Sequence, residues 1–304
     1  MSVLNEVRQE SPSQLQQLTQ LVAAYTEVTK PKILVMLVFT SLCAAIVAES
    51  GIPSISTLFF MLLSASLSAG GSAAINMWYD RDIDGIMERT AQRPIPSGTV
   101  EPQSVLRFGI ILGILSIVIA FAFVNPLTAF LNAAGYLYYA VVYTMWLKRR
   151  TPLNIVIGGG AGAFPILIGW ASVTGSLNLT ALLMFMVVFL WTPPHSWALA
   201  LYKNEEYTKA GIPMMPVVKG ARSTKLQSLL YMLLLFVSSV ILYVSGQFNF
   251  IYLASAVLFN SILLYCTWKM WKESDNQFIW AKRTFICSLF YILGMFSAMV
   301  AGIL

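Results

Sequence analysis

Residues 57–93 read TLFFMLLSASLSAGGSAAINMWYDRDIDGIMERTAQR. The first part, residues 57–78, is mostly apolar, whereas residues 76–93 gather three aspartates and three arginines. An apolar run of about 20 residues is long enough to cross the hydrocarbon core of a bilayer as an α-helix. The segment therefore predicts a membrane-spanning helix that ends in a charged loop at the membrane surface.

The rest of the chain repeats this apolar pattern. Its 304 residues are 58% hydrophobic and 11% charged, and the mean hydropathy is +0.73. These values predict an all-α polytopic membrane protein with nine transmembrane helices. We expect a polar tail, mobile or lying on the surface, over residues 1–25 and one transmembrane domain over residues 26–304. The expected spans are 33–48, 57–78, 108–124, 127–147, 153–173, 179–201, 226–244, 250–268 and 285–304.

The basic residues orient these helices, because cytoplasmic loops of membrane proteins carry an excess of Lys and Arg. In a nine-helix arrangement all 19 Lys and Arg residues fall on one side. This predicts a multi-pass protein of the cell membrane with a cytoplasmic N-terminus and an external C-terminus. The net charge of +6 also suits a surface near anionic lipid, so we expect the lipid bilayer and no nucleic acid as a partner.

The charged loop has an informative spacing, since Asn76, Asp80 and Asp84 stand four residues apart. A helix brings such positions onto one face, where two bare carboxylates repel each other unless a cation lies between them. This favours Mg2+, which Mn2+ could replace, and Mg2+ held by few carboxylates completes its shell with water and substrate phosphate. The alternative is a solvated loop whose acids pair with Arg81 and Arg89.

A second loop, residues 195–220, follows four expected spans later and contains GIPMMPV at residues 211–217. Both loops come after an even-numbered helix, so both lie on the cytoplasmic side. The offset indicates a weak internal duplication in which each half contributes a loop to one cavity.

The two loops together resemble a known family. The first is similar to the first aspartate-rich motif of the UbiA superfamily of intramembrane prenyltransferases, and the resemblance covers about residues 25–304. Its motif residues are Asn76, Asp80, Asp84, Arg89, Arg93 and Pro94. The later stretch WTPPHSWALALYK, residues 191–203, continues through Glu205, Glu206 and Tyr207 and resembles the branch of the superfamily that farnesylates haem.

This resemblance implies a reaction in which farnesyl diphosphate alkylates a vinyl group of haem B. Water then completes the side chain of haem O, and diphosphate is released. Haem B is thus a substrate rather than a permanent cofactor. A haem A synthase or the assembly of a terminal oxidase could receive the product.

The resemblance also implies the roles of individual residues. Asp80 and Asp84, assisted by Asn76, would hold Mg2+ against the diphosphate, because charge on the leaving group must be neutralised. Direct donors to the diphosphate would be Arg89, Arg93, Lys148 and Lys203, with Lys30 as a weaker candidate. Any one of these cations could instead serve orientation only.

The second loop departs from the wider superfamily, where many relatives carry a second aspartate motif. Here Glu205 and Glu206 precede Tyr207, which stands where an aspartate is expected. A second metal ion could use Glu205, or Lys203 could contact phosphate in its place. The departure matches the haem branch and argues against the usual quinone or chlorophyll prenyltransferases.

His195 is the only histidine, and three roles for it stay open. It could pack against backbone groups freed by the prolines before it, ligate the haem iron, or remove a proton and orient the acceptor. Trp191 and Tyr202 could wall the porphyrin or shield a carbocation, or they could be ordinary membrane-boundary anchors. Tyr143 could face the same cavity or belong to a packing stripe.

Two other functions compete with haem farnesylation. One is a UbiA-type prenyltransferase for an aromatic or quinone precursor. The other is a transporter, although the acids cluster at one membrane face and not at the midplane. The glycine run at residues 158–162 and the cysteines Cys43, Cys266 and Cys287 fall within expected spans, so we expect all of them to serve packing.

Overall fold

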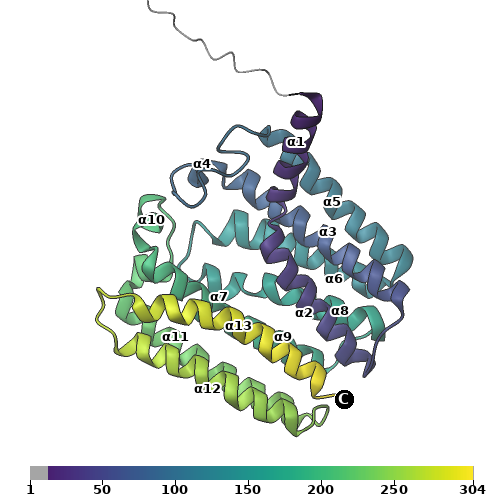
Figure 1. Ribbon diagram of the computed structural model, residues 1–304, viewed down its shortest axis with the longest axis vertical. Coiled ribbons are helices and arrows are strands. Elements are labelled where there is room, and N and C mark those ends of the chain that lie inside the picture. The colour runs from purple at the N-terminus through teal and green to yellow at the C-terminus, as the bar shows by residue number, and fades with distance from the viewer. Residues whose placement is uncertain (1–12, 304) are drawn as a thin grey trace, which may run out of the picture.

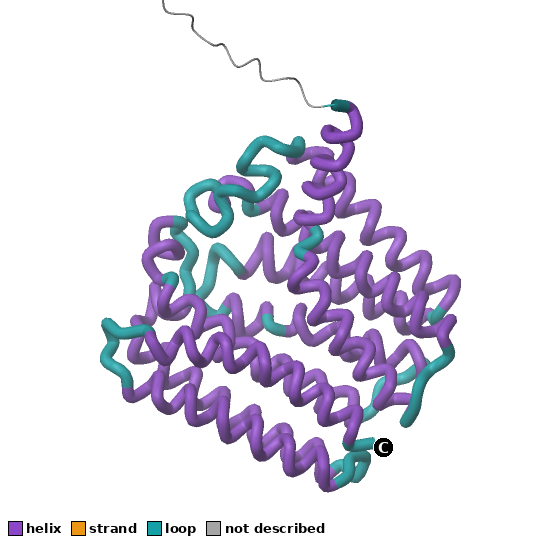
Figure 2. The backbone as a smooth tube through the Cα atoms, viewed as in Figure 1, coloured by secondary structure: helices purple, strands orange, loops and turns teal. Residues whose placement is uncertain are grey.

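The computed structural model describes residues 13–303 as a bundle of helices without strands in that range (Figures 1 and 2). Residues 1–12, which include half of the expected tail and Arg8, lie outside the described residues. The remainder of the tail forms α1 (Gln14–Val28), which begins with a capping box at Ser13. The division into a mobile tail and one domain therefore stays a prediction.

Eight helices within residues 13–303 are long and apolar enough to cross a membrane. They are α2 (Pro31–Glu49), α3 (Ile55–Tyr79), α5 (Pro102–Phe123), α7 (Asn154–Gly158) with α8 (Gly160–Thr174), α9 (Leu179–Tyr202), α11 (Met215–Val244), α12 (Phe250–Lys272) and α13 (Ile279–Ala301). The protein is thus an all-α polytopic membrane protein, as predicted.

The expectation of nine spans was wrong, and the difference lies at residues 127–147. This segment is not one α-helix, because α6 (Pro126–Leu137) gives way to the π-helix η1 (Tyr138–Leu147). At the end of η1 the backbone N–H of Lys148 donates to the carbonyl of Tyr143, five residues back, over 2.9 Å. Hydropathy reports how apolar a segment is and not which hydrogen-bond register it adopts, so the sequence pattern missed the change of winding.

The helices pack in neighbouring pairs, with α3 along α5, α2 along α8 and α9 along α11. The short helices α4 (Arg81–Asp84) and α10 (Asn204–Lys209) lie at the same end of the bundle as α1 (Figure 1). Four helices start from the opposite end, and each has a side-chain N-cap there. The caps are Ser54, Asn125, Asn178 and Asn249. Such caps accept hydrogen bonds from backbone amides that have no partner within the helix. The helix starts at the uncharged end are therefore satisfied locally.

Candidate active site

Asp80 lies at the C-cap of α3 and is fully buried. Its carboxylate accepts a hydrogen bond from the Lys148 ammonium and another, over 2.9 Å, from the Asn76 amide. The same amide nitrogen donates to Thr144 Oγ1 over 3.0 Å. Thr144 in the π-helix η1 and Lys148 just after it therefore both contact the first aspartate motif.

Asp84 is also buried, and it is paired with Arg93 over 2.6 Å. The Thr90 hydroxyl donates to the Asp84 backbone carbonyl over 2.8 Å and closes the loop between the two partners. Asp82, between the two buried aspartates, instead keeps 59% of its side chain exposed and pairs with Arg149 over 2.7 Å. This bond lowers the pKa of the Asp82 carboxyl. Along the turn from Asp80 through α4, two carboxylates, Asp80 and Asp84, are thus buried and the one between them is exposed.

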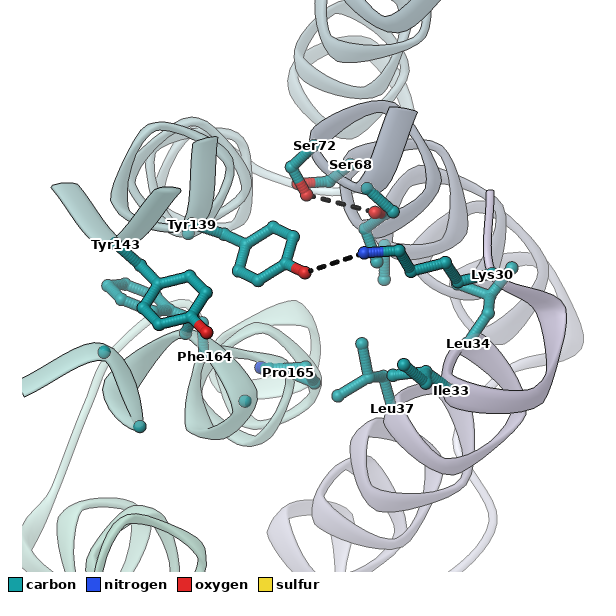
Figure 3. A pocket seen from close by; sticks show the side chains of 18 of the residues that line it. Lys30, Ile33, Leu34, Leu37, Ser68, Ser72, Tyr139, Tyr143, Phe164 and Pro165 are labelled. Carbon is teal, nitrogen blue, oxygen red and sulfur yellow. Dashed lines mark hydrogen bonds between the residues drawn. The ribbon is translucent and has the colours of Figure 1, made fainter. Parts of the chain in front are cut away.

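Lys30 approaches the same motif from the start of α2. Its ammonium donates to Asn76 Oδ1 over 2.5 Å. It also donates to the Tyr139 hydroxyl over 3.3 Å (Figure 3). Burial, with a further contribution from the charge of Arg93, lowers the pKa of Lys30 to about 8. Lys30 is therefore a more central member of the site than its place before the first span indicated.

A cavity of about 290 Å3 opens beside this cluster. Figure 3 shows Lys30 and Tyr139 facing each other across it, with apolar side chains of α2 and α8 around them. Tyr139 and Tyr143 stack with ring centroids 5.6 Å apart. The apolar part of the lining includes Ile33, Leu34, Leu37, Val38, Ile155, Phe164, Pro165 and Ile168. One side of the cavity is thus charged, while most of its wall is apolar.

The second loop packs on the first. Tyr207 on α10 is buried in a cluster with Ile83 and Met87 of the first loop and with Met214 and Met215. Burial raises the pKa of the Tyr207 phenol, and the nearby Arg89 opposes this rise. The two loops, which are distant in sequence, therefore meet at one end of the bundle.

Lys203 and the two glutamates of this loop differ in their surroundings. Lys203 pairs with Glu206 over 2.5 Å, and this hydrogen bond raises the pKa of Lys203. Glu206 Oε2 is buried without a hydrogen-bond partner, whereas Glu205 is exposed. The structure therefore points to Glu206, and not to Glu205, as the acid that faces inward.

His195, Trp191 and Tyr202 lie on another face of α9. Trp191 stacks on His195, and Phe285 of α13 contacts both His195 and Tyr202. None of the three lines the cavity described above, whereas their neighbours Thr192 and Ser196 do. Of the predicted site residues, Lys30 and Tyr143 line this cavity. The Asn76–Asp80–Lys148 cluster adjoins it through Lys30, and the aromatic group around His195 lies on another face of α9.

Two polar groups of the site escaped the sequence analysis. Arg149 lies 3.5 Å from Asp80 Oδ1, and Thr144 bonds to Asn76. A Lys-Arg-Arg run after a span is the usual signal of membrane orientation, so nothing singled out Arg149. Thr144 lies in the π-helix η1, where its hydroxyl also donates to the Tyr139 carbonyl five residues back.

The carboxylates fit a hard divalent cation. Asp80 Oδ1 is buried and has no hydrogen-bond partner, and Asp84 and the Asn76 amide add further oxygens. Residues 13–303 contain no cluster of three or more His, Cys, Asp or Glu side chains that could enclose a metal ion. A cation at these two carboxylates would have to complete its shell with water and phosphate oxygens, which Mg2+ accepts.

Comparison with known proteins identifies the family of this chain. Residues 37–292 match the model of the UbiA prenyltransferase family. The chain is 48% identical over 284 residues to the protoheme IX farnesyltransferase of Symbiobacterium thermophilum, covering 93% of this chain and 95% of the relative. It is 44% identical over 276 residues to the protein of that name from Methylococcus capsulatus, covering 91% and 92% of the two chains.

Solved structures agree in fold. A structure described as digeranylgeranylglyceryl phosphate synthase superposes with a TM-score of 0.78 at 18% identity, covering 93% of this chain and 98% of that one. A UbiA homologue from Archaeoglobus fulgidus, solved with DMAPP and Mg2+, gives a TM-score of 0.63 at 17% identity, covering 90% and 98%. The chain belongs to the UbiA prenyltransferase family and, within it, to the group of protoheme IX farnesyltransferases.

Proposed function

We propose that this protein is an intramembrane prenyltransferase that transfers the farnesyl group of farnesyl diphosphate to haem B and so makes haem O. The observation that carries the proposal is the juxtaposition of a polar cluster and a mostly apolar cavity. In the cluster, Lys148 contacts Asp80 and Lys30 contacts Asn76. A diphosphate with an apolar tail has the same two-part character. Relatives more than 40% identical over more than 90% of the chain carry the name of this activity.

The chemical task is to separate an allylic cation from a diphosphate. Lys148, Arg93 and Lys30 supply positive charge where negative charge develops on the leaving group. Such preorganised charge is effective because it sits away from bulk water and does not have to reorient during the reaction. In the structure Lys148 and Arg93 are held by Asp80 and Asp84, so each is already oriented before substrate binds.

Asp80 and Asp84, with the Asn76 amide oxygen, would hold Mg2+, for which Mn2+ can substitute. When bound, the metal ion supplies further charge neutralisation to the diphosphate. A UbiA homologue has been solved with this cation and DMAPP.

The apolar wall has a separate role, which is to hold the farnesyl chain and exclude water from the cation. Tyr139 and Tyr143 stack within the lining, and the faces of aromatic rings attract positive charge. These two rings would therefore stabilise the allylic cation until the vinyl group of haem B attacks it. Tyr207 lies over the same end and closes the second loop on the first.

The charged end of the bundle faces the cytoplasm in this proposal. Although α6 is too short to count as a span by itself, α6 and η1 together lead from the Asn125 cap at the uncharged end to Lys148 at the charged end. The amino end of α2 would then lie inside and the carboxyl end of α13 outside. Lys and Arg gather at the charged end, and the connections at the opposite end carry almost no charge. Lys and Arg near helix ends are retained on the cytoplasmic side.

The test is product analysis after the purified protein is incubated in detergent with haem B, farnesyl diphosphate and Mg2+. We expect a haem that carries a hydroxyethylfarnesyl group, detected by mass spectrometry. Asp80→Asn should lower its rate by about 100-fold or more, because the carboxylate that orients Lys148 and would hold Mg2+ against the leaving group is lost. Asp82→Asn is the matched control, since Asp82 belongs to the same run but is exposed. An aromatic acceptor modified in place of haem would establish the rival prenyltransferase activity instead.

A further inference from the structure

His195, the single histidine of the chain, is held in one orientation by two helices. Trp191 stacks on the imidazole at a centroid distance of 4.3 Å with an interplanar angle of 19°. Phe285 of α13 stacks on it at 4.7 Å and 25°. At one edge, Nδ1 lies 2.6 Å from the hydroxyl oxygen of Ser288, also on α13. Both faces of the imidazole and its Nδ1 atom are therefore in contact with other residues. Only the Nε2 edge makes no hydrogen bond to a described residue.

The Ser288 hydroxyl indicates which nitrogen carries the proton. Its oxygen lies 2.6 Å from the Phe285 carbonyl oxygen, and a hydroxyl has only one proton to donate. If that proton goes to the carbonyl, the hydroxyl oxygen accepts from Nδ1–H, and Nε2 carries a lone pair. In the opposite arrangement the Ser288 proton goes to Nδ1, and its hydrogen bond to the Phe285 carbonyl is lost, which is the costlier choice. Ser288 thus favours the tautomer whose Nε2 can bind a metal ion.

His195 lies on a helix that lines the cavity. Thr192 and Ser196 of α9 line the cavity, and His195 lies between them in sequence. Successive residues of an α-helix are rotated by about 100°, so His195 occupies the adjoining face of the same helix. Its side chain is only half-buried. A group bound to His195 would therefore lie on the helix that also forms one wall of the cavity.

We infer that His195 is the axial ligand, through Nε2, that holds the iron of the acceptor haem next to the cavity. This inference rests on the proposed function, which supplies a haem as substrate. Ser288 acts through His195 and is a positioning residue, because a hydrogen bond to the second ring nitrogen fixes the tautomer and makes the ligand more basic. Ligation at α9 would fix where the porphyrin edge, and with it a vinyl group, meets the allylic cation.

The experiment measures haem binding by the full chain in detergent without farnesyl diphosphate. Because the chain has one histidine, the protein must be purified with a tag that contains none. We expect ferrous haem B bound to the wild type to show an iron–histidine stretching band in resonance Raman spectra. His195→Gly should lose this band, and added imidazole should restore it. Ser288→Ala should weaken haem binding by about 10-fold or more, whereas Ser288→Thr should bind haem like the wild type.

The outcomes separate this inference from the proposed function. If the wild type makes haem O but its bound haem lacks the iron–histidine band, the inference is overturned and the function stands. Unchanged haem spectra in His195→Gly, or a thiolate or phenolate signature in the wild type, would overturn it equally. An iron–histidine band without any haem product would support the ligand and overturn the farnesyl transfer. Since the wild-type spectrum decides the first outcome, the conclusion does not depend on how well any variant folds.

Discussion

At the scale of single residues, Asp84 and Asp82 provide a close comparison of two carboxylates in one turn. Asp84 is buried against Arg93, whereas Asp82 faces solvent beside Arg149. If Asp84 binds the cation, Asp84→Asn should raise the Mg2+ concentration for half-maximal activity by about 10-fold or more, because one charged ligand is lost. Asp82→Asn should leave it within about twofold. Metal titrations of chelator-treated enzyme measure both values, and equal shifts in the two variants would remove Asp84 from the cation site.

At the scale of secondary-structure elements, two glycines of α8 differ in the space around them. A Cβ atom at Gly169 would come within 2.1 Å of the Ser41 backbone carbonyl of α2. A Cβ atom at Gly162, on the same helix, would meet nothing within 4 Å. Overpacking between two backbones cannot be relieved by a change of rotamer.

We therefore expect Gly169→Ala to destabilise the protein by about 1–3 kcal/mol or more. Gly162→Ala should be neutral or slightly stabilising, since alanine favours a helix. Thermal unfolding in detergent compares the two variants directly. Similar midpoints for both would show that the contact between α2 and α8 does not require a glycine.

At the scale of the whole molecule, the charge distribution predicts which end faces which side of the membrane. Glu101 is exposed next to the start of α5 at the charged end, and Ile52 is 83% exposed at the opposite end. In a chain whose three cysteines are replaced by alanine, Ile52→Cys should react with a membrane-impermeant maleimide in intact cells. Glu101→Cys should react only after the membrane is opened. The reverse pattern would place the charged end outside.

Much of the architecture follows from the sequence alone. Apolar runs of about 20 residues require helices that satisfy their own backbone in lipid, so the all-α bundle is evident from composition. The spacing of Asn76, Asp80 and Asp84 was enough to mark them as one group, because four residues make about one helical turn. The family resemblance also implied Arg93 and Lys148 as site residues, and in the structure they pair with Asp84 and Asp80.

Tertiary structure decided what depends on contacts between distant segments. The π-helical winding of η1 brings Thr144 to Asn76, and the docking of the second loop buries Tyr207. Neither leaves a periodic signal, because each depends on which side chains meet across the bundle. The contacts of Lys30 with Asn76, of Lys203 with Glu206 and of His195 with Ser288 depend on packing in the same way. Sequence determined the helices and the kinds of ligand available, whereas packing determined which of those ligands face one another.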